Sequence, residues 1–421
     1  MADLSTNLAG IRSPNPFWLA SGPPTNEGSM VQRAFDHGWG GAVWKTLGEP
    51  IVNVCSRLAS VDLGPQRMMG LNNIELITDR PWDVNLREIA DTKKKYPKHA
   101  VIVSLMVEST RETWHEAVKR VQDTGCDGFE LNFGCPHGMS ERGMGAAVGQ
   151  VPEYTKMITE WAKEASEIPV LVKLTPNVTD VTFLARAAQE GGADGVSLIN
   201  TINSVIGVDL DTLVPYPDVD GKSSHGGYCG PAVKPIALNM VSAIAKTTGG
   251  RLPISGIGGI QTWRDAAEFL ALGSTTVQVC TAVMHYGYRI VEELSDGLSR
   301  YLDEKGMASV NDLVGASVHR VSDWGELNLG FKTVARVVQD HCIRCNLCYV
   351  ACRDGAHQCI DFVTANGARY PRVIEEDCVG CNLCHLVCPS PGAIEMVRVD
   401  DGQTPRTWRD VVRAGGEKEH T

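Results

Sequence analysis

The sequence predicts an α/β protein in two parts: a TIM (β/α)8 barrel, followed by an α+β ferredoxin domain with two iron–sulfur clusters. Short apolar runs alternate with segments of helical periodicity from about residue 16 to residue 305, and eight cysteines recur at regular spacing near the C-terminus. A chain of 421 residues that is 43% hydrophobic and 21% charged can bury a large core and hold a second, smaller domain.

Eight runs have the length and composition of buried strands, and most of them are followed by a segment with helical spacing. The runs are Phe17–Ser21, Gly41–Thr46, Ala100–Val107, Gly128–Phe133, Pro169–Leu174, Gly195–Asn200, Pro253–Gly258 and Thr276–Thr281. Eight such units fit a closed barrel. A doubly wound open sheet is the alternative, because periodicity alone does not show closure.

The predicted boundaries follow from where this alternation stops. We expect the barrel in residues 1–305, a linker in 306–336, the ferredoxin-like domain in 337–400 and a polar tail in 401–421. The tail is charged and contains glycine, which is typical of a loosely ordered terminus or of a segment that lies against a partner.

Polar and reactive residues stand at the carboxyl ends of most predicted strands, where TIM barrels carry their active sites. They are Ser21, Lys45 and Thr46, Asn132 and Cys135, Lys173, Asn200 and Thr201, Gly258 and Gly259, and Cys280 and Thr281. So many polar and reactive residues at one end of the predicted barrel are hard to explain by stability alone.

Cys135 follows the fourth strand directly and opens a glycine-rich loop that also holds His137 and Arg142. A thiol presented on such a loop is placed like an acid or a nucleophile. The alternative is a buried cysteine that acts as a small hydrophobic residue, but the polar surroundings favour function.

Two glycine- or hydroxyl-containing turns, Ile254–Ile260 and Val279–Ala282, lie where TIM barrels commonly hold a phosphate. Lys45 and Lys173 add positive charge at the same rim, which suits the reduced ring of a flavin. The pattern therefore favours FMN. The chain lacks a Gly-x-Gly-x-x-Gly turn after the first strand, so we expect no NAD or FAD site in it.

Asn73, Asn132, Asn200 and Thr201 offer amide and hydroxyl groups that suit a flat ring with imide edges, such as a pyrimidine. Each of them is equally compatible with a role in capping a loop. A flavin beside a cysteine suits the reduction of a polarised C=C bond, because an ordinary thiol holds a proton at neutral pH.

The cysteines near the C-terminus form two copies of the Cys-x-x-Cys-x-x-Cys-x-x-x-Cys spacing of bacterial ferredoxins, which predicts two [4Fe–4S] clusters. Because the last cysteine of each run ligates the other cluster, the two predicted ligand sets are Cys342, Cys345, Cys348 and Cys388, and Cys378, Cys381, Cys384 and Cys352. A zinc site does not fit this spacing. Cys359 and His357 lie between the runs without an assigned role.

The formal net charge of −11 argues against a nucleic-acid-binding protein. Apolar runs long enough for a membrane span and a signal peptide are both missing, so we expect a cytoplasmic protein. The clusters carry single electrons, but their source is not in this chain. A partner subunit with a nicotinamide site is therefore expected.

The chain resembles the dihydropyrimidine dehydrogenase family in the run Asn132-Phe-Gly-Cys-Pro-His-Gly-Met-Ser-Glu-Arg-Gly-Met-Gly145, in Leu19-Ala-Ser-Gly-Pro-Pro24, in Val172-Lys-Leu-Thr-Pro-Asn177 and in the eight-cysteine region. This resemblance implies that Cys135 protonates C5 of uracil or thymine while FMN reduces C6. It implies a base site of Asn73, Asn132, Asn200 and Thr201, and an FMN site of Ala20, Lys45, Thr46, Lys173, Gly230, Gly258, Gly259, Cys280 and Thr281.

The same resemblance implies that FAD and the NAD(P)H site belong to a separate PreT-like subunit, and that the barrel forms a homodimer within a hetero-oligomer. Gly134 stands where mammalian members have Ser, so one contact to the substrate is expected to be absent. Two alternatives remain at this point: a class 1 dihydroorotate dehydrogenase, which needs a cationic site for a carboxylate, and an iron–sulfur electron-transfer subunit without catalysis.

Overall fold

The computed structural model describes residues 1–135, 143–365, 367–399, 402 and 404–415. The chain divides into two compact units, Met1–Val321 and Ser322–Thr421. The first unit is built on a parallel barrel and the second on two antiparallel strand pairs.

The eight predicted strands form one closed barrel in the order β10-β13-β14-β3-β4-β7-β8-β9. Its strands are β3 (Phe17–Leu19), β4 (Gly41–Leu47), β7 (Ala100–Leu105), β8 (Gly128–Asn132), β9 (Val170–Lys173), β10 (Gly195–Leu198), β13 (Ile254–Ile257) and β14 (Ser274–Val279). The predicted fold class is confirmed, and closure between β14 and β3 rules out the open sheet.

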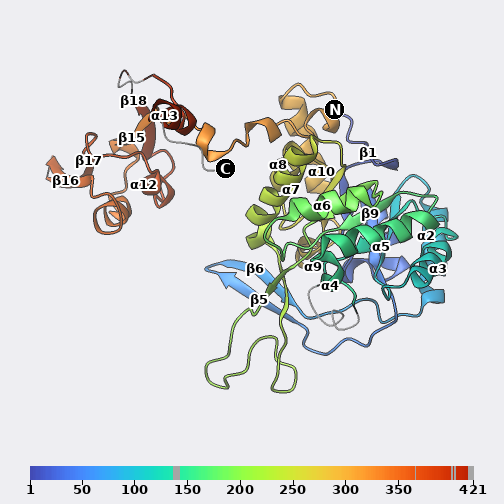
Figure 1. The fold of residues 1–421 in the computed structure, drawn as a ribbon. Coiled ribbons are helices and arrows are strands. Elements are labelled where there is room, and N and C mark those ends of the chain that lie inside the picture. Colours follow the sequence, from blue (N-terminus) through green and yellow to red (C-terminus); the bar gives the residue numbers. More distant parts are fainter. Residues whose placement is uncertain (136–142, 366, 400–401, 403, 416–421) are drawn as a thin grey trace. The chain divides into compact units, whose positions relative to one another are not determined.

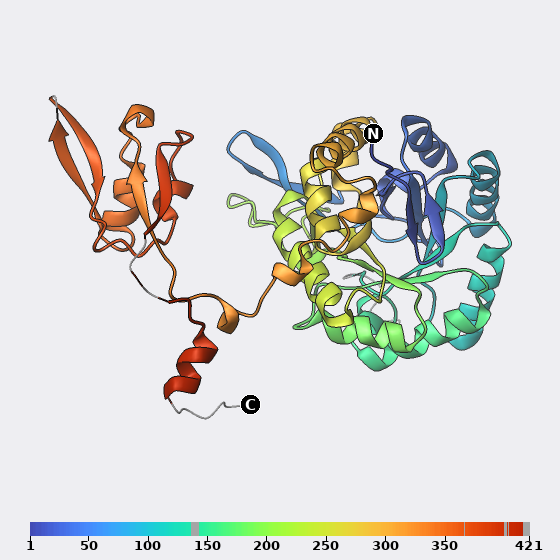
Figure 2. The same cartoon turned by 90° about the horizontal axis from the view of Figure 1, so that it is seen from above.

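Helices surround this barrel as a ring (Figure 2). They are α1 (Gly28–His37), α2 (Trp82–Lys95), α3 (Arg111–Gln122), α4 (Ala146–Gly149), α5 (Pro152–Ala165), α6 (Val181–Glu190), α7 (Lys234–Thr248), α8 (Trp263–Ala271), α9 (Thr281–Tyr286) and α10 (Ile290–Glu304). The helix ends follow local sequence rules. For example, the Thr110 hydroxyl accepts from the N–H of Thr113 at the start of α3, and α1 ends at Gly38 with φ 106°.

A four-stranded antiparallel sheet, which the sequence pattern did not predict, is built from loops that follow barrel strands. Its strands are β5 (Leu58–Leu63), β6 (Gln66–Asn73), β11 (Ile202–Ser204) and β12 (Gly226–Cys229), in the order β11-β12-β6-β5. The β5–β6 pair stands out from the barrel in Figure 1. This sheet brings distant loops together, since Asn73 on β6 pairs with Gly227 on β12. A separate N-terminal hairpin joins β1 (Thr6–Leu8) and β2 (Ile11–Ser13).

The first unit extends further than predicted. Residues 306–321 contain the short turns η4 (Val310–Asp312) and η5 (Val318–Arg320) and pack at the end of α8. The N–H groups of Gly315 and Ser317 donate to the carbonyls of Leu270 (2.9 Å) and Ala271 (2.8 Å). This part of the expected linker therefore belongs to the barrel unit, because its backbone hydrogen bonds are made there.

The second unit contains two antiparallel pairs, β15 (Lys332–Val337) with β18 (Ile394–Val399), and β16 (Ile360–Ala365) with β17 (Ala368–Val373). Between the strands lie the cysteine runs and the short helices α11 (Leu347–Tyr349) and α12 (Leu383–Leu386).

The expected polar tail is partly structured, which corrects the prediction for that segment. It contains α13 (Trp408–Gly415), and the ring of Trp408 lies 6.2 Å from that of Trp324. Arg409 Nη1 lies 2.9 Å from Glu326 Oε1 in the same unit. In the described part of the chain, no helix is long and apolar enough to cross a membrane.

Candidate active site and cluster cavities

A cavity opens at the carboxyl ends of the barrel strands. All the predicted barrel-site residues line it, although they come from separate loops. They are Ala20, Lys45, Thr46, Asn73, Asn132, Cys135, Lys173, Asn200, Thr201, Gly230, Gly258, Gly259, Cys280 and Thr281. The fold thus gathers in one place the groups that the strand-end rule and the family resemblance picked out separately.

The two lysines of the cavity are buried, and each faces a buried carboxylate. Lys45 Nζ forms a close ion pair with Glu75, and Lys173 Nζ lies 3.4 Å from Glu130 Oε1. Taking a charge out of water is costly unless an opposite charge compensates it, so the pairs allow both cations to sit at the cavity wall. The sequence pattern picked out both lysines but neither glutamate.

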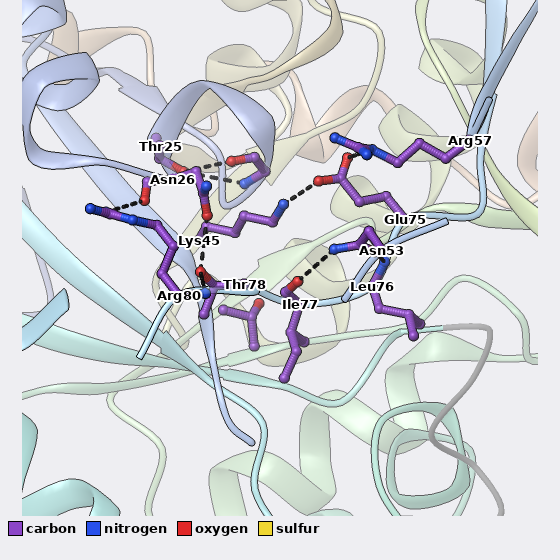
Figure 3. A network of polar contacts seen from close by, with 12 residues as sticks. Thr25, Asn26, Lys45, Asn53, Arg57, Glu75, Leu76, Ile77, Thr78 and Arg80 are labelled. Carbon is purple, nitrogen blue, oxygen red and sulfur yellow. Dashed lines mark hydrogen bonds and ion pairs between the residues drawn. The ribbon is translucent and has the colours of Figure 1, made fainter. Parts of the chain in front are cut away.

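Glu75 belongs to a segment that crosses near the cavity and is held on several sides (Figure 3). Arg57 Nε lies 3.7 Å from the second Glu75 oxygen. The side chain of Asn53 accepts from the N–H of Leu76 (2.7 Å) and donates to the carbonyl of Ile77 (3.2 Å). Because its neighbours are fixed through the main chain, the carboxylate is held next to Lys45.

The far end of this segment is fixed to the loop after β3. Thr78 Oγ1 donates to Asn26 Oδ1 (3.0 Å), and Arg80 Nη1 donates to the Asn26 carbonyl (2.9 Å), as Figure 3 shows. Arg80 also forms two hydrogen bonds with Glu88 on α2, at 2.8 and 2.6 Å. These bonds lower the pKa of the Glu88 carboxyl below its ordinary value.

The predicted base-binding residues form a connected polar chain. Asn132 Nδ2 donates to Thr46 Oγ1 (3.1 Å), and Asn200 Nδ2 donates to Asn132 Oδ1 (3.0 Å). The N–H of Thr201 in turn donates to Asn200 Oδ1 (2.8 Å). Asn73 approaches from β6, where its Nδ2 donates to the Gly227 carbonyl (3.4 Å). Such a network fixes the orientation of each amide before a ligand arrives.

Cys135 lies just beyond the end of β8, is 9% exposed and contributes to the cavity wall. Its carbonyl accepts from the N–H of Ala146 (3.0 Å), which fixes the far end of the loop at α4. Gly145 has φ 59°, and a Cβ there would lie 3.1 Å from the Cys135 Cβ. The predicted loop residues His137 and Arg142 lie outside the described residues.

The backbone conformation and close packing of the glycine turns fit the approach of a phosphate-bearing flavin. Gly258 and Gly259 have φ of 135° and 77°, a region that favours glycine. A Cβ on Gly259 would lie 2.9 Å from the Gly230 carbonyl oxygen, so the backbone of the two turns comes too close for side chains. The N–H groups of Gln261 and Thr262, which follow this turn, donate to the Asp265 carboxylate.

Several cavity residues were not predicted from the sequence. Glu75, Tyr228, Gln278 and Cys229 also line the cavity. Thr281 Oγ1 donates to the Cys229 sulfur (3.2 Å). Burial raises the pKa of Cys229 to about 11 and that of Cys280 to about 12, so both stay neutral thiols at physiological pH.

The eight cysteines of the two ferredoxin runs surround two separate cavities in the second unit. Cys342, Cys345, Cys348 and Cys388 line a cavity of about 310 Å³. Cys352, Cys378, Cys381 and Cys384 line another of about 340 Å³. Each cavity takes three cysteines from one run and the fourth from the other run, which is the arrangement that two [4Fe–4S] clusters require. The thiols therefore fit the predicted clusters.

Comparison with known proteins agrees with both units. Residues 3–302 match the dihydroorotate dehydrogenase family model, and residues 335–396 match that of the 4Fe-4S dicluster domain. The NAD-dependent dihydropyrimidine dehydrogenase subunit PreA of Escherichia coli strain K12 is 42% identical over 365 residues, covering 86% of this chain and 88% of PreA.

Two further relatives each match three quarters of the chain. Chloroplastic dihydropyrimidine dehydrogenase (NADP(+)) of Arabidopsis thaliana is 43% identical over 328 residues, covering 75% of this chain and 77% of that protein. The catalytic subunit of dihydroorotate dehydrogenase B (NAD(+)) of Pyrococcus horikoshii is 37% identical over 315 residues, covering 75% of this chain and 98% of that subunit. The chain therefore belongs to the dihydroorotate dehydrogenase family of flavin oxidoreductases and, within it, is a homologue of the dihydropyrimidine dehydrogenase subunit PreA.

Proposed function

We propose that this chain reduces the C5=C6 bond of uracil or thymine to the 5,6-dihydropyrimidine, reversibly, with Cys135 as the acid that protonates C5. The observation that carries this proposal is the single cavity in which Cys135, the four polar residues of the base site and the two lysines meet. FMN, when bound there, would supply the hydride that C6 receives.

The lysines would hold the flavin and balance its charge. Lys45 and Lys173 lie at the ends of β4 and β9, and both line the cavity. A cation beside a flavin stabilises the negative charge of the reduced ring. The glycine backbone at Gly230, Gly258 and Gly259, with Cys280 and Thr281, would take the phosphate.

The polar chain from Thr46 through Asn132 and Asn200 to Thr201 would orient the base. A pyrimidine presents carbonyl and N–H groups along its edges, and amide side chains can pair with both kinds. Because these amides are fixed by one another, the base would be held with C5 towards Cys135 and would not rotate in the cavity.

A neutral substrate fits the charges of the cavity better than a carboxylate does. Lys45 and Lys173 are the only cationic side chains among the described lining residues, and both are assigned here to the flavin, so no further cation is left for a substrate carboxylate. Dihydroorotate, after which the Pyrococcus relative is named, and its oxidised form orotate both carry such a carboxylate. The charge balance therefore favours uracil or thymine over orotate, although the Pyrococcus relative makes a dihydroorotate dehydrogenase the second candidate.

The two clusters would relay electrons between the flavin and a partner subunit. The relative PreA is named as a subunit of an NAD-dependent enzyme, which supports a partner of the PreT kind that holds FAD and the NAD(P)H site. We also propose a homodimer of this chain within the hetero-oligomer.

The test uses the full chain, purified without oxygen and reduced chemically, so that no partner is needed. We expect a flavin band over broad cluster absorbance, and reoxidation of the flavin by uracil or thymine but not by orotate. Reoxidation by orotate alone would favour the second candidate. A protein that binds no flavin, or whose reduced flavin ignores all three compounds, would contradict the proposal and leave the electron-transfer alternative.

A further inference from the structure

The two cluster cavities differ in the number of cysteines that line them. The cavity of Cys352, Cys378, Cys381 and Cys384 is lined by a fifth cysteine, Cys359, whereas the other cavity is lined by four. Cys359 belongs to neither ferredoxin run, and it is 4% exposed. The neighbouring His357, in contrast, is exposed.

The Cys359 sulfur lies 3.4 Å from the Cys352 sulfur, within hydrogen-bonding distance. The main chain holds this contact in place. The N–H groups of Ala356 and Gln358 donate to the Cys352 carbonyl at 3.2 and 2.9 Å, and the N–H of Ile374 donates to the Cys359 carbonyl at 2.8 Å. The two sulfurs are therefore kept together by a tight turn and by the end of β17.

We propose that Cys359 donates its S–H hydrogen to the Cys352 sulfur when Cys352 ligates iron, and that it thereby raises the reduction potential of that cluster above that of its twin. The inference rests on the proposed two-cluster function. A ligand sulfur carries no proton, so the hydrogen between the two sulfurs must come from Cys359.

The expected direction follows from charge. Reduction adds one electron to the cluster, and a hydrogen bond to a ligand sulfur stabilises the more negative state. Described residues offer the other cavity no matching thiol. Two clusters with the same cysteine spacing would thus differ in potential, which would give electron transfer between them a preferred direction.

The experiment measures the potentials of both clusters by an EPR-monitored redox titration of the full chain. In Cys359→Ala we expect the iron content to stay at about eight atoms per chain. The higher of the two potentials should move to a more negative value, while the lower one stays unchanged. Cys359→Ser keeps a donor and should stay closer to the wild type.

Cys126→Ala is the matched control, because Cys126 is equally buried but lies in the barrel unit. It should leave both potentials unchanged. If Cys359→Ala does not fold, Cys359→Val fills the space of the thiol without a donor and takes its place.

Unchanged potentials in a fully loaded Cys359→Ala protein would overturn the inference. Loss of about four iron atoms would also overturn it, because Cys359 would then be a ligand and not a donor. If the wild-type protein binds no clusters, the proposed function itself is contradicted, so the two failures can be told apart.

Discussion

The barrel cavity takes its lining from residues between Ala20 and Met284, whereas each cluster cavity takes its four predicted ligands from two short runs of the chain. The barrel site mixes charged, amide, hydroxyl and thiol groups that hold one another in place. The cluster sites use one residue type. The comparison indicates that barrel substitutions should have graded effects, while cluster substitutions should remove a cofactor entirely.

The largest expected effect comes from removing a single cluster ligand. Cys345→Ala should lose about four iron atoms and abolish electron delivery from a partner subunit, because a cluster needs its four cysteines. Uracil should still reoxidise the chemically reduced flavin. Iron analysis and single-turnover spectra measure the two effects. Cys55→Ala, another exposed cysteine, is the control. Retention of all the iron in Cys345→Ala would contradict the predicted ligand set.

Within the barrel, the two lysine–glutamate pairs should differ in how much each contributes to the free energy of unfolding. Lys173→Met leaves Glu130, fully buried, without its cation and should lower the free energy of unfolding by about 3–5 kcal/mol. Lys45→Met should cost less, about 1–2 kcal/mol, because Arg57 remains 3.7 Å from Glu75. Urea unfolding of the flavin-free variants measures both losses, and equal losses would argue against the compensating role of Arg57.

A smaller change is expected where the structure leaves no room for a side chain. A Cβ on Gly134 would lie 2.5 Å from Asn200 Nδ2, so Gly134→Ser should displace the Asn200 amide. We expect KM for uracil to rise by about tenfold or more, which corresponds to an overpacking cost of about 1–3 kcal/mol. Gly207→Ala is the control, because a Cβ there would make only an ordinary contact, 3.8 Å from Tyr216 Cδ2. An unchanged KM would show that Asn200 does not orient the base.

The smallest effect concerns the pH dependence of stability. Because the pKa of Glu88 is lowered in the folded protein, its contribution is present above the unfolded pKa of about 4.3 and is lost as the pH falls through the folded pKa. Arg80→Met should remove about 1 kcal/mol at pH 7 and almost nothing at the lowest pH. Urea midpoints of both proteins from pH 7 downwards test this, and a difference independent of pH would contradict it.

The same comparison explains what the sequence predicted and what it did not. Apolar runs identified all eight barrel strands, and cysteine spacing grouped the thiols as the two cavities do. Strand-end reasoning found Lys45 and Lys173 because they lie near the carboxyl ends of barrel strands. It missed Glu75 and Tyr228, because these residues come from the two loops that build the four-stranded sheet. The pairing of β6 with β12 in that sheet brings together loops that are distant in the sequence. Glu130 was missed because it lies inside an apolar strand.

The central claim is that Cys135 acts as the acid in the barrel cavity. The most direct measurement is single-turnover reoxidation of the chemically reduced flavin by uracil, in the wild type, Cys135→Ser and Cys135→Ala. We expect Cys135→Ala to bind flavin normally and to react about 10²–10⁴-fold more slowly, with Cys135→Ser in between. Reoxidation of Cys135→Ala at the wild-type rate would contradict the account.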